Sequence, residues 1–114
     1  MMGDNSGFVW AFYNAQYHIN QCAIQHGWWD HDRNDGETIA LIHSELSEAL
    51  EALRNGDPES KHIPGHTQLE EELADVVIRC MDYAYSKGIN LGAAIDAKHA
   101  FNRDRPYKHG GKKF

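Results

Sequence analysis

Two acidic pairs, Glu45/Glu48 and Glu72/Asp75, are the residues of this sequence whose types and spacing most readily support chemistry. Within each pair the carboxylates are three residues apart, and residues at that spacing share one face of an α-helix. Two antiparallel helices carrying such pairs would bring four carboxylates to a common centre. Because four carboxylates repel one another, the pattern indicates bound divalent cations, and Mg²⁺ and Mn²⁺ prefer oxygen ligands. We therefore expect metal-dependent phosphate chemistry.

A second group of polar residues, Lys98, Asn102 and Arg105, recurs at the i, i+4, i+7 spacing of one helix face. An arginine can bind two phosphate oxygens at once, and a lysine acts as a point charge. These residues belong to a basic segment, 98–114, in a chain whose formal net charge is −6. The segment predicts phosphate binding, with a basic helix end that stabilises the helix dipole as the alternative. The overall acidity argues against a nucleic-acid-binding protein.

Four helices and no strand are expected to position these residues, because apolar residues recur at helical spacing along most of the chain. Thr67 with Glu70, and Asn34 with Glu37, match capping boxes at helix starts. Glycine or proline follows each helix, where it ends the pattern. The expected helices are 6–25, 34–54, 67–87 and 90–105, and the residues that stop them are Gly27, Gly56, Gly88 and Pro106. The fold class is therefore all-α, a bundle of four to five helices.

The apolar stripes of these helices predict the hydrophobic core. Glu45 and Glu48 lie beside the stripe of the second helix, which is unusual for solvated surface acids, and Cys22 and Cys80 are expected to be buried free thiols. The second helix contributes Ile39, Ile42, Leu46, Leu50 and Leu53 to the expected core, and the third contributes Leu69, Leu73, Val76, Cys80 and Ala84. The acids expected to be ordinary surface residues are Glu51, Glu59, Glu70, Glu71 and Asp82.

The chain length of 114 residues predicts a single domain over 1–114, with flexible ends at 1–5 and 108–114. The sequence has neither a signal-peptide pattern nor an apolar run long enough for a membrane helix, so we expect a cytoplasmic protein without a membrane partner. A zinc site is disfavoured although the chain has eight histidines. His62 and His66 have helical spacing, but Pro64 between them excludes a helix.

Further segments accompany the acidic pairs in a fixed order. They are Gly27-Trp28-Trp29-Asp30, the acidic segments 42–49 and 71–77, and the run from Lys98 through Arg105-Pro106-Tyr107 to His109-Gly110-Gly111-Lys112. In this combination, over residues 27–113, the sequence resembles the MazG-like all-α nucleoside triphosphate pyrophosphohydrolases. The stripe of Lys98, Asn102 and Arg105 makes the resemblance more specific, because acidic helices alone are common.

The resemblance implies an enzyme that hydrolyses a nucleoside triphosphate, ribo or deoxy, between the α and β phosphates. The products would be a nucleoside monophosphate and pyrophosphate, and the role would be to control or cleanse nucleotide pools. It also implies two or three Mg²⁺ or Mn²⁺ ions per site and a homodimer or homotetramer with sites near the subunit interface. Short stand-alone relatives of this kind occur in bacteria and bacteriophages, so the host cytoplasm is the expected location if the chain comes from a phage.

Roles for individual residues follow from the resemblance and from the residue types. Glu45, Glu48, Glu72 and Asp75 would bind the metal ions, and Glu48 or Glu45 would accept a proton from the attacking water. The sequence does not separate ligand from base. Lys98 and Arg105 would stabilise the leaving pyrophosphate, with Asn102 orienting a phosphate or ribose oxygen; His109, and Lys61 in the loop before the third helix, would add phosphate contacts.

The base-binding residues are the least constrained part of this interpretation. Trp28 and Trp29 would stack on a nucleobase, or else plug the end of the first helix as hydrophobic residues. Asn14, His18 and Asn20 on the first helix would read the edge of the base. Base and sugar preference stay open.

Two other functions are alternatives to the enzyme. One is a non-catalytic helical oligomer that binds nucleotides or metals as a regulatory module. The other is a metal bundle of oxidase type, which is disfavoured because its Glu-x-x-His pairs are missing from the expected helices. For any of these functions we expect self-association, because Tyr13, Tyr17, Ile78 and Tyr85 lie off the core stripes and leave apolar surface uncovered.

Overall fold

The computed structural model describes residues 5–114, apart from the side chain of His109, and its elements are all helical. The helices are α1 (Ser6–Gln25), α2 (Asp35–Arg54), α3 (Gln68–Ser86), α4 (Leu91–Arg103) and a short α5 (Lys108–Gly111). This confirms the all-α class, and α1–α4 agree with the expected ranges to within two residues at each end. Residues 1–4 lie outside the described residues, and the flexibility of 108–114 stays a prediction. No described helix has the length and apolar character that crossing a membrane requires.

Local signals explain where the helices begin. The Asn34 side chain accepts hydrogen bonds from the backbone N–H groups of Gly36 and Glu37, and Asn90 caps α4 in the same way. Thr67 and Glu70 form the complete capping box expected at the start of α3. At the start of α2 only the Asn34 half of the expected box is present. These caps fix the first turns of the two helices that carry the acidic pairs.

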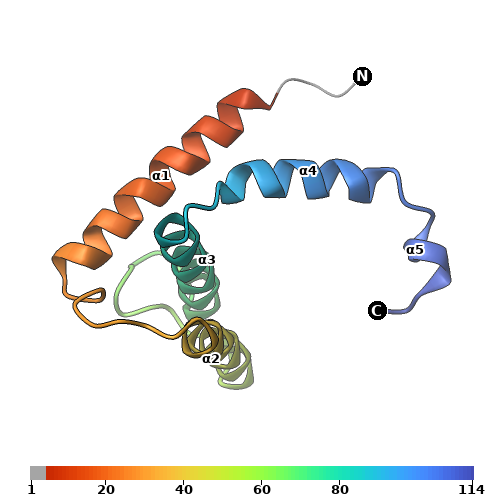
Figure 1. Cartoon of the computed structure of the whole chain (residues 1–114). Helices are drawn as coiled ribbons and strands as arrows, with labels where there is room; N and C mark the ends of the chain where they lie inside the picture. Colours follow the sequence, from red (N-terminus) through yellow and green to blue (C-terminus); the bar gives the residue numbers. More distant parts are fainter. Residues whose placement is uncertain (1–4) are drawn as a thin grey trace.

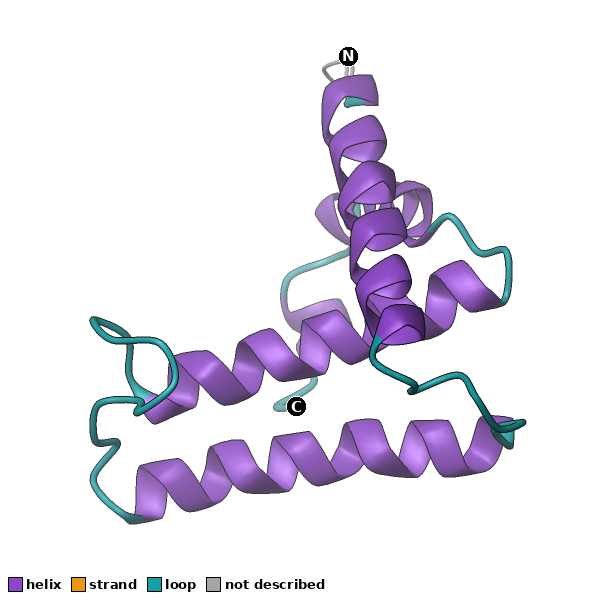
Figure 2. Cartoon of the chain, turned by 90° about the vertical axis from the view of Figure 1, so that its left-hand side faces the viewer, coloured by secondary structure: helices purple, strands orange, loops and turns teal. Residues whose placement is uncertain are grey.

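The helices form an open arrangement around α3. Figure 2 shows α2 and α3 side by side, with the loop at one end making them antiparallel, while α1 crosses α3 and contacts α4. In Figure 1 the far end of α4 and the short α5 extend away from the α2–α3 pair. The buried Gln16 side chain donates to the Ile89 carbonyl at 2.6 Å and so ties α1 to the turn before α4. At Gly92, α4 is so close to α1 that an added Cβ would lie 2.9 Å from the Phe12 Cβ.

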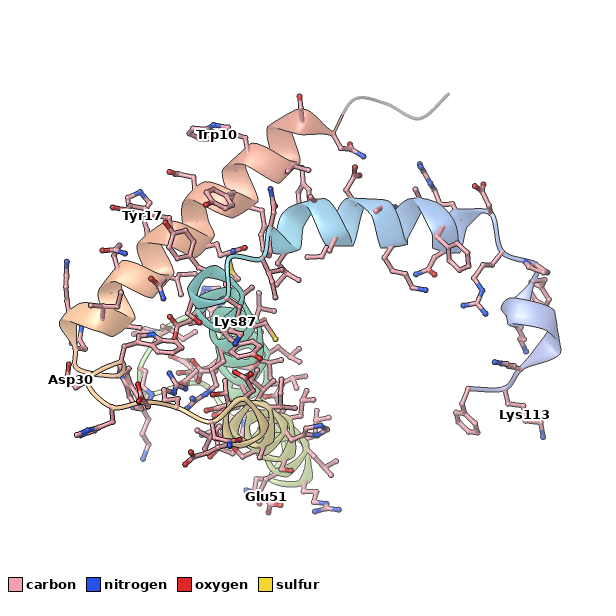
Figure 3. The ribbon with its side chains drawn as sticks, in the orientation of Figure 1. Trp10, Tyr17, Asp30, Glu51, Lys87 and Lys113 are labelled. Atoms are coloured by element: carbon pink, nitrogen blue, oxygen red, sulfur yellow. The ribbon has the colours of Figure 1, made fainter. Side chains whose placement is uncertain are left out.

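The chain has little core of its own. Its radius of gyration is 16.6 Å, against about 13 Å for a compact domain of similar length. Among the described residues, the buried apolar side chains are only Ala49, Ala52, Met81 and Ala84. The exposed side chains of Trp10 and Tyr17 project from α1 in Figure 3. A chain this open leaves a large apolar area in contact with water.

The face of α2 that packs inside the chain differs from the expected one. Thr38, Glu45, Ala49 and Ala52 are buried, because the small alanines let α3 approach closely. The expected core stripe turns outward, so that Leu50 is 49% exposed. The residues of this outward stripe that are exposed are Ile39, Leu46, Leu50 and Leu53, joined by Leu73 on α3. Cys22 is also exposed, contrary to the expectation of a buried thiol, and Cys80 is half-buried.

Candidate metal centre and adjoining pocket

Three of the four predicted metal ligands converge where α2 packs against α3. Glu45 comes from α2, and Glu72 and Asp75 come from successive turns of α3. One carboxylate oxygen of each lies within 4.8 Å of the others. The i, i+3 spacing within α3 and the antiparallel pairing with α2 produce this convergence, as the sequence pattern predicts. Oxygen atoms in such a group suit Mg²⁺ or Mn²⁺.

The electrostatics of the cluster fit a cation. Glu72 Oε2 is inaccessible to water and has no hydrogen-bond partner among the residues that the structure describes. Burial, together with the neighbouring Glu48 and Glu45 carboxylates, raises the pKa of Glu72 to about 7. Burial and the charge of Glu45 also raise the pKa of Asp75. Both shifts reflect negative charge without enough compensation, and a divalent cation held by these oxygens would supply it.

Glu48 occupies a different position from the other three carboxylates. It is exposed and does not belong to the converging group, yet its carboxylate contributes to the raised pKa of Glu72. It therefore lies at the solvent-facing edge of the cluster, one turn along α2 from the buried Glu45. A carboxylate at this edge can reach either a cation or a water molecule beside it.

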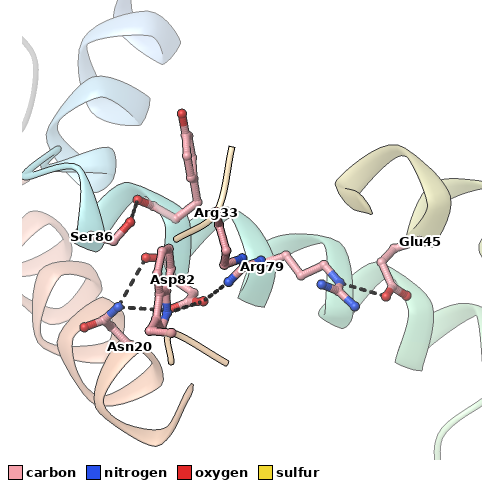
Figure 4. A network of polar contacts seen from close by, with 8 residues as sticks. Asn20, Arg33, Glu45, Arg79, Asp82 and Ser86 are labelled. Atoms are coloured by element: carbon pink, nitrogen blue, oxygen red, sulfur yellow. Dashed lines mark hydrogen bonds and ion pairs between the residues drawn. The ribbon is translucent and has the colours of Figure 1, made fainter. Parts of the chain in front are cut away.

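Arg79 provides a positive charge beside the carboxylate cluster. Its Nε donates a hydrogen bond to Glu45 Oε1 at 2.8 Å, as drawn in Figure 4. Burial would raise the pKa of Glu45, but Arg79 and the adjacent carboxyl groups outweigh this effect and lower it. Glu45 is thus held ionised and in a fixed orientation, which is the state a metal ligand needs.

A pocket of about 450 Å³ adjoins the cluster. It lies between α1, the connector 26–34, α2 and α3, and its wall is largely apolar, with charged residues that include Glu45, Asp75 and two arginines. Concave, largely apolar pockets with a few convergent polar groups are typical small-molecule sites. The other lining residues are Ile19, Cys22, Ala23, His26, Trp28, Thr38, Ile42, Ile78 and Asp82.

The two adjacent tryptophans have different surroundings. Trp28 lines the pocket and is 58% exposed, so its ring is available for stacking. Trp29 faces away from this pocket, and its Nε1 donates to both oxygens of Asp82, at 2.9 and 3.1 Å. The Arg33 guanidinium lies 4.5 Å from the centre of the Trp29 ring. Trp29 therefore anchors the connector.

Asp82, expected to be a surface acid, is buried and organises this anchor. It accepts hydrogen bonds from Trp29 and from the Asn20 amide at 2.8 Å, and it pairs with Arg33 at 3.8 Å (Figure 4). The Asn20 side chain, which we proposed would read the edge of a base, thus donates a hydrogen bond to Asp82. The signal in the sequence was that Asp75, Arg79 and Asp82 follow the i, i+4, i+7 spacing of one helix face.

The loop before α3 is held beside the cluster by polar contacts. The Ser60 hydroxyl, which is buried, donates to Glu71, and His62 Nδ1 lies 2.7 Å from the other Glu71 oxygen. The Glu71 partner raises the pKa of His62, with smaller contributions from Asp75 and Glu72. Glu71 was expected to be a plain surface acid, but it fixes this loop. Lys61 is exposed between these two anchored residues.

The basic stripe of α4 is not brought to the cluster within one chain. Among the described helices α4 contacts α1 and α3 but not α2, and no residue of the stripe lines the pocket. The Lys98 ammonium instead lies 4.5 Å from the Phe101 ring centre, and the Arg105 guanidinium 5.6 Å from it. Asn102 is exposed, and the side chain of His109 lies outside the described residues.

Comparison with known proteins gives one informative relative. The chain is 36% identical over 76 residues to a dATP/dGTP diphosphohydrolase of Cyanophage S-2L. The matched part is 67% of this chain and 61% of that protein, so the chain spans about three fifths of the relative's length. No protein-family model and no solved structure matches the chain. The likeness to MazG-like enzymes therefore rests on the motifs described above.

Proposed function

We propose that this protein hydrolyses nucleoside triphosphates between the α and β phosphates, giving a nucleoside monophosphate and pyrophosphate. The observation that carries the proposal is the carboxylate cluster of Glu45, Glu72 and Asp75 at the edge of a 450 Å³ pocket. A nucleoside in the pocket would hold its phosphates at the carboxylates. The name of the cyanophage relative, a dATP/dGTP diphosphohydrolase, supports the same class of reaction. We also propose membership of the MazG-like all-α enzymes, on the motifs that suggested it.

The chain's own residues divide the work between binding and proton transfer. Glu45, Glu72 and Asp75 would hold Mg²⁺ or Mn²⁺, with Glu48 at the edge of the group. When bound, the cations neutralise charge on the triphosphate and lower the pKa of water. Glu48 is the exposed carboxylate of the group, so it is placed to accept the proton of the water that attacks the α phosphate.

Purine deoxynucleotides are the proposed substrates. The relative's name specifies dATP and dGTP, and the pocket wall offers Trp28 as a stacking surface with apolar side chains around it. A purine presents a larger stacking face than a pyrimidine, so an exposed indole favours it. Residues 26–33 would move little during binding, because Asp82 and Arg33 hold Trp29 in place.

We further propose a homo-oligomer, either a dimer or a tetramer, that completes the site. The outward stripe of α2, which includes Leu46, Leu50 and Leu53, is an apolar face that a second copy would cover. The basic stripe of α4 lies apart from its own chain's carboxylates, so a second copy would present it to the triphosphate. Such an enzyme would act on nucleotide pools in the cytoplasm, or in the cytoplasm of a host cell if it comes from a phage.

The decisive experiment is product analysis. The purified protein is incubated with each dNTP and NTP in the presence of Mg²⁺ or Mn²⁺, and the products are separated by ion-exchange chromatography. We expect dAMP or dGMP with pyrophosphate. Release of a nucleoside diphosphate with inorganic phosphate would contradict the site of cleavage. Tight nucleotide binding without any turnover would instead favour a regulatory module.

A further inference from the structure

Arg79 stands between the carboxylate cluster and the pocket. Its Nε is bonded to Glu45, while its guanidinium lines the pocket and lies 5.9 Å from the centre of the Trp28 ring. The side chain is 28% exposed. Among the described residues no hydrogen bond or ion pair engages either of its Nη groups, which leaves their N–H donors available on the pocket side.

The other arginine of the pocket has a different position. The Arg33 Nη1 pairs with Asp82 Oδ2 at 3.8 Å, and its guanidinium lies over the Trp29 ring, so Arg33 holds the connector. Both guanidinium groups keep N–H donors that the described contacts do not engage. Only Arg79 is bonded to a carboxylate of the cluster, through its Nε and Glu45. Its remaining donors are therefore the ones beside the cluster.

We propose that Arg79 is a further substrate-binding residue, which donates its Nη hydrogen bonds to the phosphate attached to the nucleoside. This inference rests on the proposed function, because it takes the ligand to be a nucleotide. A nucleotide stacked on Trp28 with its distal phosphates at Glu72 and Asp75 must pass Arg79 with the sugar and the first phosphate. Arginine suits this position because its rigid planar fork directs Nε to Glu45 and the Nη groups toward a phosphate oxygen in one fixed geometry, whereas a lysine is a point charge on a flexible stem.

The test compares a nucleoside with its monophosphate in the presence of EDTA, so that neither divalent cations nor hydrolysis contribute. Deoxyadenosine and dAMP are titrated into the wild-type protein and into Arg79→Met, and binding is followed by calorimetry. A charge-assisted hydrogen bond to phosphate corresponds to roughly a ten- to hundredfold preference for dAMP. We expect Arg79→Met to lose this preference while its affinity for deoxyadenosine stays within about twofold.

Two further variants make the result specific. Arg79→Lys keeps the charge without the fork, and we expect it to retain only part of the preference for dAMP. Arg54→Met removes an exposed arginine of α2 that pairs with Glu51, and we expect it to behave as wild type. Far-ultraviolet circular dichroism and a melting curve show whether each variant is folded. If Arg79→Met is unfolded, the comparison of Arg79→Lys with wild type decides the question.

Three results would overturn the inference: equal affinity of the wild-type protein for both ligands, an unchanged preference in Arg79→Met, or an equal loss for both ligands. The last result would mean that Arg79 shapes the pocket and does not contact phosphate. The proposed function is tested separately. If the dAMP preference depends on Arg79 but the protein does not hydrolyse dATP with Mg²⁺ or Mn²⁺, the role of Arg79 stands and the proposed enzymatic function is wrong.

Discussion

The α2–α3 pair and the helix α4 both carry polar stripes, but their surroundings are very different. On α2 and α3, Glu45 is bonded to Arg79, Glu71 holds the preceding loop, and Asp82 anchors the connector. Lys98 on α4 and Arg105, two residues beyond the end of α4, both lie near the Phe101 ring. The first region is organised by contacts between elements of the chain, whereas in the second Lys98 is exposed and Arg105 is half-buried.

This difference bears on the division of the site that we propose. The carboxylates proposed to hold metal ions need fixed positions, and the cluster has them through contacts inside the chain. The cations proposed to bind phosphate would be supplied by a second subunit. The exposed apolar stripe of α2 and the projecting α4 fit this division. Each prediction below tests one side of it.

Removal of a cluster carboxylate should have the largest effect. Asp75→Ala deletes a proposed metal ligand on the ordered side of the site, and we expect kcat to fall about a thousandfold or more, since metal ions contribute several kcal/mol of transition-state stabilisation. The apo protein should melt at the same or a higher temperature, because repulsion with Glu45 is relieved. Steady-state kinetics measure kcat, and calorimetry measures the melting temperature.

Glu51→Ala, on the exposed side of α2, is the control and should leave kcat and the melting temperature unchanged. Activity of Asp75→Ala within a few-fold of wild type would exclude Asp75 as a ligand.

Loss of the α4 cations should have a smaller effect on catalysis and almost none on folding. We expect Lys98→Ala and Arg105→Ala each to lower kcat/KM about ten- to a hundredfold, the value of one charge-assisted phosphate contact. Arg103→Ala and Lys108→Ala lie off the stripe and should be nearly silent. A fall in melting temperature with normal kinetics would show instead that these side chains only stabilise the helix end.

Mixing two impaired variants tests whether these cations act across subunits. Asp75→Ala and Lys98→Ala are unfolded together and refolded as mixed oligomers, and each is also refolded alone. If Lys98 serves the cluster of a second copy, some sites in the mixture combine an intact cluster with an intact stripe, and activity exceeds that of either variant alone. No gain in a mixture shown to contain both chains would place both halves of the site in one chain.

A charge in the outward apolar stripe of α2 should disrupt assembly. Leu50 is 49% exposed in the single chain, so Leu50→Glu leaves the folded chain almost unaffected but buries a charge in any interface formed by this face. We expect light scattering to show an oligomer for the wild type and a smaller species for the variant at micromolar concentration. Glu51→Gln, at the next position, is the matched control. A monomeric wild-type protein would rule out the proposed assembly.

The smallest expected effect is on the pH dependence of stability without divalent cations. The pKa of Glu72 is raised from 4.5 to about 7, so folding takes up a proton between these values. The free energy of unfolding should therefore fall as the pH rises from about 4.5 to 7. Glu72→Gln should reduce this fall, and the difference between variant and wild type isolates Glu72 from Asp75 and His62, which act in the same direction. Urea unfolding at several pH values measures it; equal slopes would contradict the shift.

The sequence predicts the local features of this protein well. Caps such as Thr67 with Glu70, and stops such as Gly88, depend on neighbouring residues, so the helix limits follow from short segments. The convergence of Glu45 with Glu72 and Asp75 follows from helical spacing and antiparallel pairing. No comparable stop predicts the short α5, which lies in a segment expected to lack an element of its own.

The features that the sequence did not reveal depend on which elements meet. The stripe containing Leu50 looks like a core face, but the alanines on the neighbouring face of α2 pack against α3 instead. Periodicity cannot distinguish an apolar face buried in the chain from one left for a partner. Asp82 looked like a surface acid because its partners, Trp29 and Asn20, are distant in sequence. Arg79 escaped assignment for the same reason.

The close approach of Gly92 to Phe12 fixes the start of α4, so that a tilt of the helix moves its far end most. The helix is fixed at its first turn, where a Cβ would lie 2.9 Å from the Phe12 Cβ, and α4 ends at Arg103, about 16 Å further along, given the rise of 1.5 Å per residue, with Arg105 just beyond. A tilt of a few degrees at this pivot would displace the Arg105 end by an ångström or more. The direction in which Lys98 and Arg105 point therefore depends on Gly92, and a single methyl group at that position would change it.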